Sequence, residues 1–182
     1  MGAGLILGGR LYAGANDMAG EVGHIRLAED GPLGYGKAGS FEGFCSGGGI
    51  ARLARALAAE RLAAGDPPGF CRTAAGLDAV SAQTVGEAAR AGDPLAIDIY
   101  AAVGRRLGQA LAILVDTLNP QRIVIGSIFG RQRELLEPFA LEVLRREALS
   151  VALGACEIVP AGLGEQVGDY AGLSVALYQL QQ

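Results

Sequence analysis

The stretch from Pro94 to Leu118 constrains the fold of this chain more than any other part of it. Apolar residues recur at helical spacing along it, and alanines fill the other faces. Asp93-Pro94 puts a proline at the first helical position, and Asn119-Pro120 ends the pattern. The β-branched run from Arg122 to Ile125 follows directly and predicts a buried strand. We therefore expect a central, mostly buried helix that leads into a sheet.

The rest of the chain also combines strands and helices. Two short apolar runs around a Gly8-Gly9 turn predict a β-hairpin over residues 4–14, whose buried first strand indicates that further chain stands upstream. No repeat or linker divides residues 1–182, so one α/β domain is expected. The other expected elements are strands at 24–27 and 156–160 and helices at 50–64, 84–90, 131–147 and 169–180, with Thr84 capping the second helix and 70–80 unassigned.

Composition excludes several classes of protein. With 182 residues, of which 51% are hydrophobic and 19% charged, the chain can bury about 70% of its unfolded surface, which excludes disorder. A net charge of −4 disfavours broad binding to nucleic acid or anionic membranes. No apolar run approaches the roughly 18 residues that span a bilayer, and no targeting signal is visible. Cys45, Cys71 and Cys156 lie far apart and form no metal-binding pair, which fits a cytoplasmic protein.

One glycine-rich run, from Gly31 to Ala38, nearly matches the phosphate-binding pattern GxxxxGK[ST]. Ala38 lacks the hydroxyl that would bind Mg²⁺, and no helix is expected to begin at Lys37. We interpret this run as a turn-rich loop.

The segment around Glu21 and His24 holds the only histidine of the chain. Their spacing lets both side chains point into one cavity if the segment forms a single helical turn. A carboxylate accepts hydrogen bonds from two neighbouring hydroxyls and an imidazole can add a third, which is the chemistry of polyol recognition. On these residues alone, a buried structural histidine beside a cap is the more ordinary interpretation.

Two further sites could hold polar ligands. Glu42 lies in a glycine-rich frame just before a helix, where polar ligands are attracted, although it could equally act as a cap. Gly126-Ser127 follows a strand in the geometry that faces nucleotides at the carboxyl edge of a sheet. Most such turns in α/β proteins contact no nucleotide.

In this order, the segments resemble the C-terminal half of the ROK family (repressors, open reading frames and kinases), whose enzymes phosphorylate hexoses with ATP. The most specific part runs from Gly2 to His24 and reads Gly-x-Gly-Leu-Ile-x-x-Gly-x-Leu-x-x-Gly-x-x-x-x-Ala-Gly-Glu-x-Gly-His. Three shorter elements agree with the family's order: Phe41-Glu42 with Ser46-Gly47, Asn119-Pro120 with Ile123-Val-Ile125-Gly126, and Pro160-Ala161 with Leu163-Gly164-Glu165.

The resemblance implies a two-domain, actin-like (ribonuclease H-like) ATPase fold with sugar and ATP in the cleft between the domains. Residues 1–182 would form the C-terminal domain. ATP with Mg²⁺ is the implied cofactor, a hexose the substrate, and a homodimer the expected assembly. By the match, the sugar-contacting positions are Glu21, His24 and Glu42, the second phosphate loop contains Gly4, and the adenosine segment turns at Gly126 and Ser127.

Two departures from the family pattern matter. ROK proteins commonly hold a structural zinc with the signature histidine and three cysteines, but the aligned positions here are Leu33, Tyr35 and Ser40, which bind zinc poorly. We therefore expect a subgroup without structural zinc, with no metal site in this chain and with His24 left for the sugar. The loop 31–44 would instead be held by apolar packing of Leu33, Tyr35 and Phe41.

The second departure is that the first phosphate loop and the aspartate that acts as base would precede Met1, so no residue here is assigned as catalytic. The resemblance implies ATP-dependent phosphorylation of a hexose, glucokinase- or fructokinase-like, by the full-length protein. The chain alone would then be inactive and would bind sugar weakly. The alternative is the sugar-sensing domain of a ROK-type transcriptional repressor, which would bind DNA only through an upstream domain. A third interpretation is a structural or oligomerisation domain.

Overall fold

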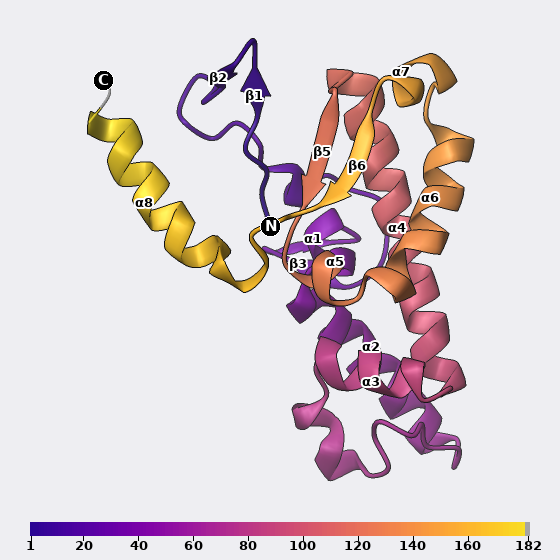
Figure 1. Ribbon diagram of the computed structural model, residues 1–182. Coiled ribbons are helices and arrows are strands. Elements are labelled where there is room, and N and C mark those ends of the chain that lie inside the picture. Colours follow the sequence, from indigo (N-terminus) through magenta and orange to yellow (C-terminus); the bar gives the residue numbers. More distant parts are fainter. Residues whose placement is uncertain (181–182) are drawn as a thin grey trace.

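Helix α4 (Pro94–Leu118) forms the centre of the computed structural model, which describes residues 1–180 without the side chains at 165, 168 and 178–180 (Figure 1). Asp93 caps the helix by accepting a hydrogen bond of 2.9 Å from the Ala96 amide, and Asn119 ends it in the left-handed conformation. The prediction of a long central helix is confirmed. Its buried side chains include Ile99, Tyr100, Val103, Leu107, Leu111 and Val115.

Helix α6 (Arg133–Glu147) lies along α4 at a distance that only glycine permits. A Cβ added to Gly104 would lie 2.8 Å from the Leu136 carbonyl oxygen, and one added to Gly108 would overlap the Ala140 carbonyl oxygen. Because α6 and α3 (Ala82–Arg90) cover α4, its apolar side chains are used in the core. The expected homodimer stays a prediction.

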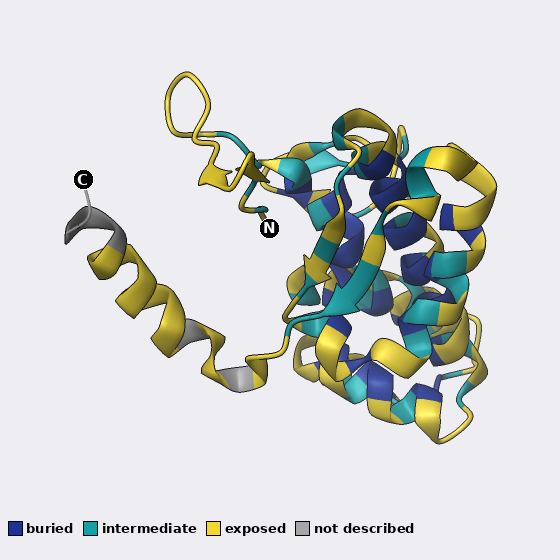
Figure 2. Cartoon of the chain, turned by 45° about the horizontal axis from the view of Figure 1, so that its top comes forward, coloured by how far each residue is buried: buried dark blue, intermediate teal, exposed yellow. Residues whose placement is uncertain are grey.

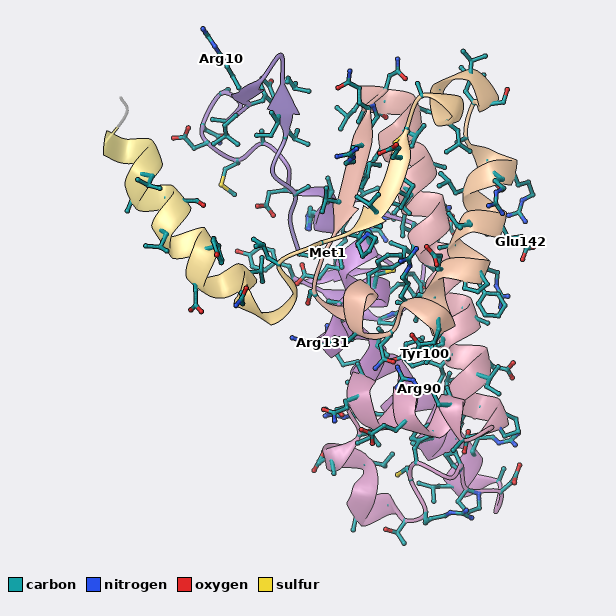
Figure 3. All side chains as sticks on the ribbon, in the orientation of Figure 1. Met1, Arg10, Arg90, Tyr100, Arg131 and Glu142 are labelled. Carbon is teal, nitrogen blue, oxygen red and sulfur yellow. The ribbon has the colours of Figure 1, made fainter. Side chains whose placement is uncertain are left out.

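A polar cluster joins α3, α4 and the start of α6. The Tyr100 hydroxyl, which is buried, donates a hydrogen bond of 2.6 Å to the Ala82 carbonyl oxygen. Nearby, the exposed Arg90 donates to Glu134 Oε1 and to Gln132 Oε1, both at 2.6 Å (Figure 3). Burial raises the pKa of Tyr100 to about 12, so this phenol is neutral at physiological pH.

Strand β5 (Arg122–Ile125) pairs in parallel with β6 (Glu157–Pro160), and α5 (Ile128–Arg131), α6 and α7 (Ser150–Gly154) connect them. This β-α-β unit confirms the predicted strands and the α/β class. Its burial differs from the prediction, because Val124 is 59% exposed while Ile123 and Ile125 are half-buried. The reason is that α4 and α6 cover the face of the sheet to which Ile123 and Ile125 point, while Val124 points to the opposite face, which is open among the described residues.

The predicted N-terminal hairpin is present as β1 (Ile6–Leu7) and β2 (Arg10–Leu11), with Gly8 and Gly9 at positive φ. The expectation that it begins with a buried strand is wrong, since Ile6 is 64% exposed. The hairpin pairs only with itself and stands away from the helices, as Figure 2 shows in yellow.

The predicted strand at 24–27 is wrong except for one bridge between Arg26 and Ser40. The chain instead forms a 3₁₀ turn, η1 (Val22–His24), because Gly23 is packed tightly against Met1. Beyond it, β3 (Leu33–Gly34) and β4 (Lys37–Ala38) form a small hairpin, so the near match to a phosphate loop has no helix at Lys37.

The expected apolar packing in the 31–44 loop is also wrong for two of its three residues. Leu33 is 56% and Tyr35 89% exposed, whereas Phe41 is buried. Side-chain donors hold the loop by its backbone: Arg52 donates to the Leu33 carbonyl oxygen at 2.7 Å, Arg26 to Ala38 at 2.9 Å and Lys37 to His24 at 2.7 Å. The charged side chains of Arg52, Arg26 and Lys37 can reach these carbonyl oxygens because the loop lies on the surface.

The remaining elements largely follow the prediction. Ser81, not Thr84, is the N-cap of α3, and Thr84 completes the capping box three residues later. Helix α8 projects from the rest of the molecule in Figure 1, with apolar side chains such as Leu173 and Leu177 exposed. Among the described helices, none combines the length and apolar character that crossing a membrane requires. The other elements are α1 (Phe41–Cys45), α2 (Gly47–Ala63), η2 (Ala74–Ala79), η3 (Gly164–Gln166) and α8 (Val167–Leu180).

Candidate functional site

The glycines of the signature segment bring Glu21 next to the first residues of the chain. The Ala3 amide donates a hydrogen bond of 2.7 Å to the Gly20 carbonyl oxygen. Gly20 has a φ of 96°, and a Cβ there would overlap the Ala3 carbonyl oxygen. A Cβ at Gly23 would overlap the Met1 carbonyl oxygen in the same way. Glu21 therefore precedes a turn that only glycine can close, and its Oε1 lies near Gly2.

Glu42 lies next to the adjoining residue, Met1. It lies in the first turn of α1, and its Oε1 is 3.3 Å from the Met1 amino group. Ser40, not Glu42, caps this helix, because the Ser40 hydroxyl accepts from the Gly43 amide at 3.1 Å. The interpretation of Glu42 as a cap is therefore wrong, and its side chain, 28% exposed, is open to a ligand.

His24 is exposed, so it is not a buried structural histidine. It ends η1, one residue after the Gly23 contact with Met1. Its ring meets the Tyr35 ring edge to face, with centroids 6.4 Å apart. The structure thus brings Glu21 and Glu42 together at Met1–Gly2 and places His24 on the adjoining turn, with its ring toward Tyr35.

A mostly apolar cavity of about 470 Å³ opens beside this cluster. Met1 and Gly2 line it from one side, Ser46 and Gly47 from another, and the turn Gly126-Ser127 from a third. Apolar side chains of α4, β5 and α5 complete the lining, and Figure 1 shows the N-terminus near the carboxyl ends of β5 and β6. The cavity thus joins three of the four motifs singled out in the sequence.

The turn after β5 leaves space at the carboxyl edge of the sheet. Ser127 adopts a positive φ of 56°, and both Gly126 and Ser127 are exposed. Gly126 lies against Ala161, whose amide donates to the Ile125 carbonyl oxygen at 3.0 Å, so the fourth motif adjoins the third. The Glu165 side chain, at the end of the fourth motif, lies outside the described residues.

Gly4 does not join this group. It lies just before β1, is exposed, and a Cβ there would have no atom within 4 Å. The structure therefore leaves Gly4 in open space, away from the lining of the cavity.

Cys45 is the one titratable side chain in the cavity lining apart from the terminus. Burial raises the pKa of its thiol, and the Sγ lies 3.6 Å from the Val103 carbonyl oxygen. A thiol held in its protonated form is a poor nucleophile and a poor metal ligand, so Cys45 acts as a core residue.

Within the described part of the chain, no three His, Cys, Asp or Glu side chains gather in a way that could hold a metal ion. At the positions aligned with the zinc cysteines, Leu33 and Tyr35 face solvent while Ser40 is buried as a helix cap. The absence of structural zinc stays a prediction.

Sequence reasoning missed the apolar cavity and the contact of Met1 with Glu42. A signal for the cavity was present: leucines occupy more of the surface of the 94–118 helix than one buried stripe needs, and Leu107, Leu111 and Leu114 all line the cavity. The Met1 contact had no signal, because it depends on where a loop returns.

Comparisons with known proteins agree with these motifs. The model of the ROK family matches residues 1–176. A glucokinase of Halalkalibacterium halodurans is 33% identical over 94% of this chain and 52% of its own length. The transcriptional regulator NagC of Escherichia coli is 32% identical over 81% of this chain and 34% of its own length.

Solved structures give the same picture. A ROK family glucokinase from Streptomyces griseus, in complex with glucose and AMPPNP, has a TM-score of 0.70 and 31% identity, covering 92% of this chain and 54% of that one. The chain therefore spans about half the length of the glucokinases it matches, and about a third of the regulator.

Proposed function

Because this chain belongs to the ROK family, we propose that it is the C-terminal domain of an ATP-dependent hexose kinase, glucokinase- or fructokinase-like. It has an α/β fold that matches about half of the length of ROK structures. The observation that carries the proposal is the convergence of Glu21 and Glu42 on Met1–Gly2, beside a cavity that the Gly126-Ser127 turn also lines. An acidic cluster and a nucleotide-type turn at one opening suit a kinase.

Glu21, Glu42 and His24 are the proposed sugar contacts. Both carboxylates can accept hydrogen bonds from vicinal hydroxyls, and the exposed imidazole can add a donor or an acceptor. All three side chains are reached by solvent, so a hexose can replace water without opening the core. Two signature glycines fix the turn that carries Glu21 and His24, which reduces the entropy lost on binding.

Gly126 and Ser127 are the proposed turn of the adenosine segment, with Gly4 in the second phosphate loop. The small residues of the turn leave room for a nucleotide at the carboxyl edge of β5 and β6. The described residues offer no ready-made cluster for Mg²⁺, so the ion would arrive with ATP and take phosphate oxygens and water as ligands. When bound, ATP supplies the phosphoryl group, and these residues position it.

We propose that an N-terminal domain completes the cleft and supplies the first phosphate loop and the aspartate base. The length of the glucokinases supports this, since the chain covers 52% of one and 54% of another. The exposed Val124 on the open face of β5 and the apolar lining beside Met1 also support it, because both are surfaces that a neighbouring element would cover. No residue of this chain is proposed as catalytic, and the chain alone is expected to be inactive.

The second candidate is the sugar-sensing domain of a ROK-type repressor. It is favoured by the 32% identity to NagC, which is as high as the identity to the glucokinases. In that case DNA would be a partner through a separate domain. The hexose site would be the same in both functions, so the described residues serve either.

The test is an ATP-coupled assay of the full-length protein with glucose and with fructose. Turnover on either sugar supports the kinase. Sugar binding without turnover, together with sugar-dependent release from operator DNA, would replace it with the repressor. Sedimentation of the same protein tests the proposed homodimer.

We also propose a cytoplasmic location, which fits the free thiols of Cys45, Cys71 and Cys156.

A further inference from the structure

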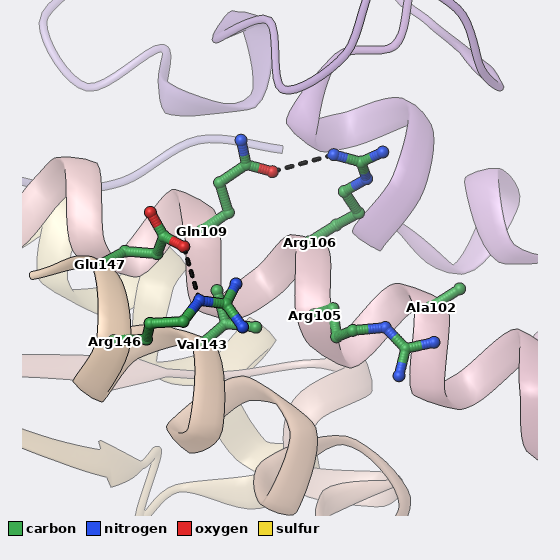
Figure 4. A pocket seen from close by; sticks show the side chains of 7 residues that line it. All are labelled: Ala102, Arg105, Arg106, Gln109, Val143, Arg146 and Glu147. Carbon is green, nitrogen blue, oxygen red and sulfur yellow. Dashed lines mark hydrogen bonds and ion pairs between the residues drawn. The ribbon is translucent and has the colours of Figure 1, made fainter.

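A second hollow, of about 410 Å³, lies between α4 and α6 and shares no lining residue with the apolar cavity (Figure 4). Arg105, Arg106 and Gln109 border it from α4, where positions three and four apart share one face. Arg146 and Glu147 border it from α6. Three arginines and one glutamate line it, so the hollow carries net positive charge on a chain whose net charge is −4.

Two of the arginines are held in place by stacking. The Arg106 guanidinium carbon lies 4.9 Å from the centroid of the Phe44 ring, and the group donates to the Leu27 carbonyl oxygen and to Gln109 Oε1. The Arg105 guanidinium carbon lies 5.6 Å from the Phe139 ring centroid. Stacking on an aromatic face restricts a guanidinium while leaving its in-plane N–H donors available.

The donors of Arg105 and Arg146 are open to a ligand. Among the described residues, none accepts a hydrogen bond from Arg105 or pairs with it. Arg146 pairs only with its neighbour Glu147, at 2.8 Å, and the two side chains are 62% and 48% exposed. An exposed pair of this kind is weak, so a stronger anion can displace it.

We propose that this groove binds the phosphate group of a small molecule. Guanidinium forks match the oxygens of phosphate in pairs, and a dianion gains more than a carboxylate from several positive charges. A hollow of this size lies within the range that small-molecule sites occupy. The ligand is either inorganic phosphate or a phosphate ester, and it binds apart from the hexose and ATP site, on which this proposal does not depend.

The test is a titration of the full-length protein with inorganic phosphate and, separately, with glucose 6-phosphate, at ionic strength held constant with chloride. Two-dimensional NMR would follow the backbone amides and the arginine side chains. We expect saturable shifts at Arg105, Arg106 and Arg146. Tighter binding of one probe assigns the source of the phosphate.

Matched variants distinguish a site from general positive charge. Arg105→Gln and Arg146→Gln should each weaken binding about ten-fold. Arg145→Gln removes the same charge from the same helix outside the hollow, and should change binding less than about two-fold. Glu147→Gln should tighten binding, because it removes the carboxylate that lines the hollow. Shifts that do not saturate, or an equal loss in Arg145→Gln, would overturn the proposal.

Discussion

The Met1 amino group lies 3.3 Å from Glu42 Oε1, so the carboxylate of the third motif is in contact with the first residue of the signature segment. Both groups are partly exposed, and the contact is an ion pair only where Met1 carries a free amino group, so it contributes at most about 1 kcal/mol to folding. The Glu42 side chain therefore contributes little to the stability of the chain. A substitution of Glu42 can test its role in function separately from its role in folding.

Glu42→Gln should change the free energy of unfolding by less than about 1 kcal/mol and lower kcat/KM for the hexose in the full-length protein about a hundred-fold. The reason is that the amide keeps the shape but accepts hydrogen bonds from hydroxyls less strongly. Urea denaturation and the coupled assay measure the two quantities. Glu29→Gln, an exposed carboxylate outside the cluster, should leave both unchanged. Full activity in Glu42→Gln would remove this residue from the sugar site.

His24→Gln should weaken hexose binding about ten-fold at nearly unchanged stability, because the ring is exposed and loses only one hydrogen bond to the ligand. Calorimetry with the full-length protein measures this. Tyr35→Leu is the matched control, because it removes the edge-to-face contact without touching the imidazole. If Tyr35→Leu weakened binding as much as His24→Gln, the imidazole would act only through its ring contact.

Gly20→Ala should destabilise the chain by about 3 kcal/mol, since the methyl group meets the Ala3 carbonyl oxygen and the backbone has a positive φ. Gly36→Ala separates these two effects. Its φ is 75°, but a Cβ there has open space, so only the backbone strain of about 1 kcal/mol remains. Thermal or urea unfolding of both variants gives the difference. Equal losses of unfolding free energy in the two variants would mean that residues 1–3 move away from the new methyl group at little cost in free energy.

Tyr100 should make stability fall between pH 10 and pH 12. Burial raises its pKa to about 12 in the folded chain, so the unfolded chain ionises first, near pH 10. The stabilising contribution is complete below pH 10 and lost as pH rises through 12, by about 3 kcal/mol in total. Urea denaturation across this range measures it.

Tyr100→Phe is the matched variant for that titration. It should lose about 1 kcal/mol at neutral pH, because the Ala82 carbonyl oxygen loses its donor, and show a shallower decline above pH 10. A decline equal to that of the unaltered chain would assign the effect to other groups, among them the Cys45 thiol, whose pKa burial also raises.

Gly108→Val should destabilise the chain by at least about 3 kcal/mol, because α6 lies against the α4 backbone at this point. Asp98→Val introduces the same side chain at an exposed position of α4 and should cost only a few tenths of a kcal/mol, about the difference in helix propensity. A small loss in Gly108→Val would show that the two helices can separate without damage to the core.

Local signals predicted the helices and parallel strands well. Asp93-Pro94, Asn119-Pro120 and the apolar spacing between them are sufficient to place α4, because capping and periodicity act within a few residues. The sequence also identified Glu21 and Glu42, which the structure brings to the adjoining residues Gly2 and Met1.

The errors concern burial and loops, which depend on distant contacts. Leu33 and Tyr35 looked like core residues because they are apolar, but backbone hydrogen bonds from Arg52, Arg26 and Lys37 hold their loop. The sequence predicts a buried position for Ile6, because strands with such residues are usually buried. In the described chain, nothing packs on its hairpin.

The free edge of β5 has a practical consequence for the chain by itself. An apolar strand with unpaired amides and carbonyls is a template on which another strand can form, and Val124 exposes an apolar side chain on the open face beside this edge. Helix α8 also exposes leucines to water, so concentrated samples of the chain should aggregate. The association should depend on how readily the exposed strand edge of one copy pairs with that of another.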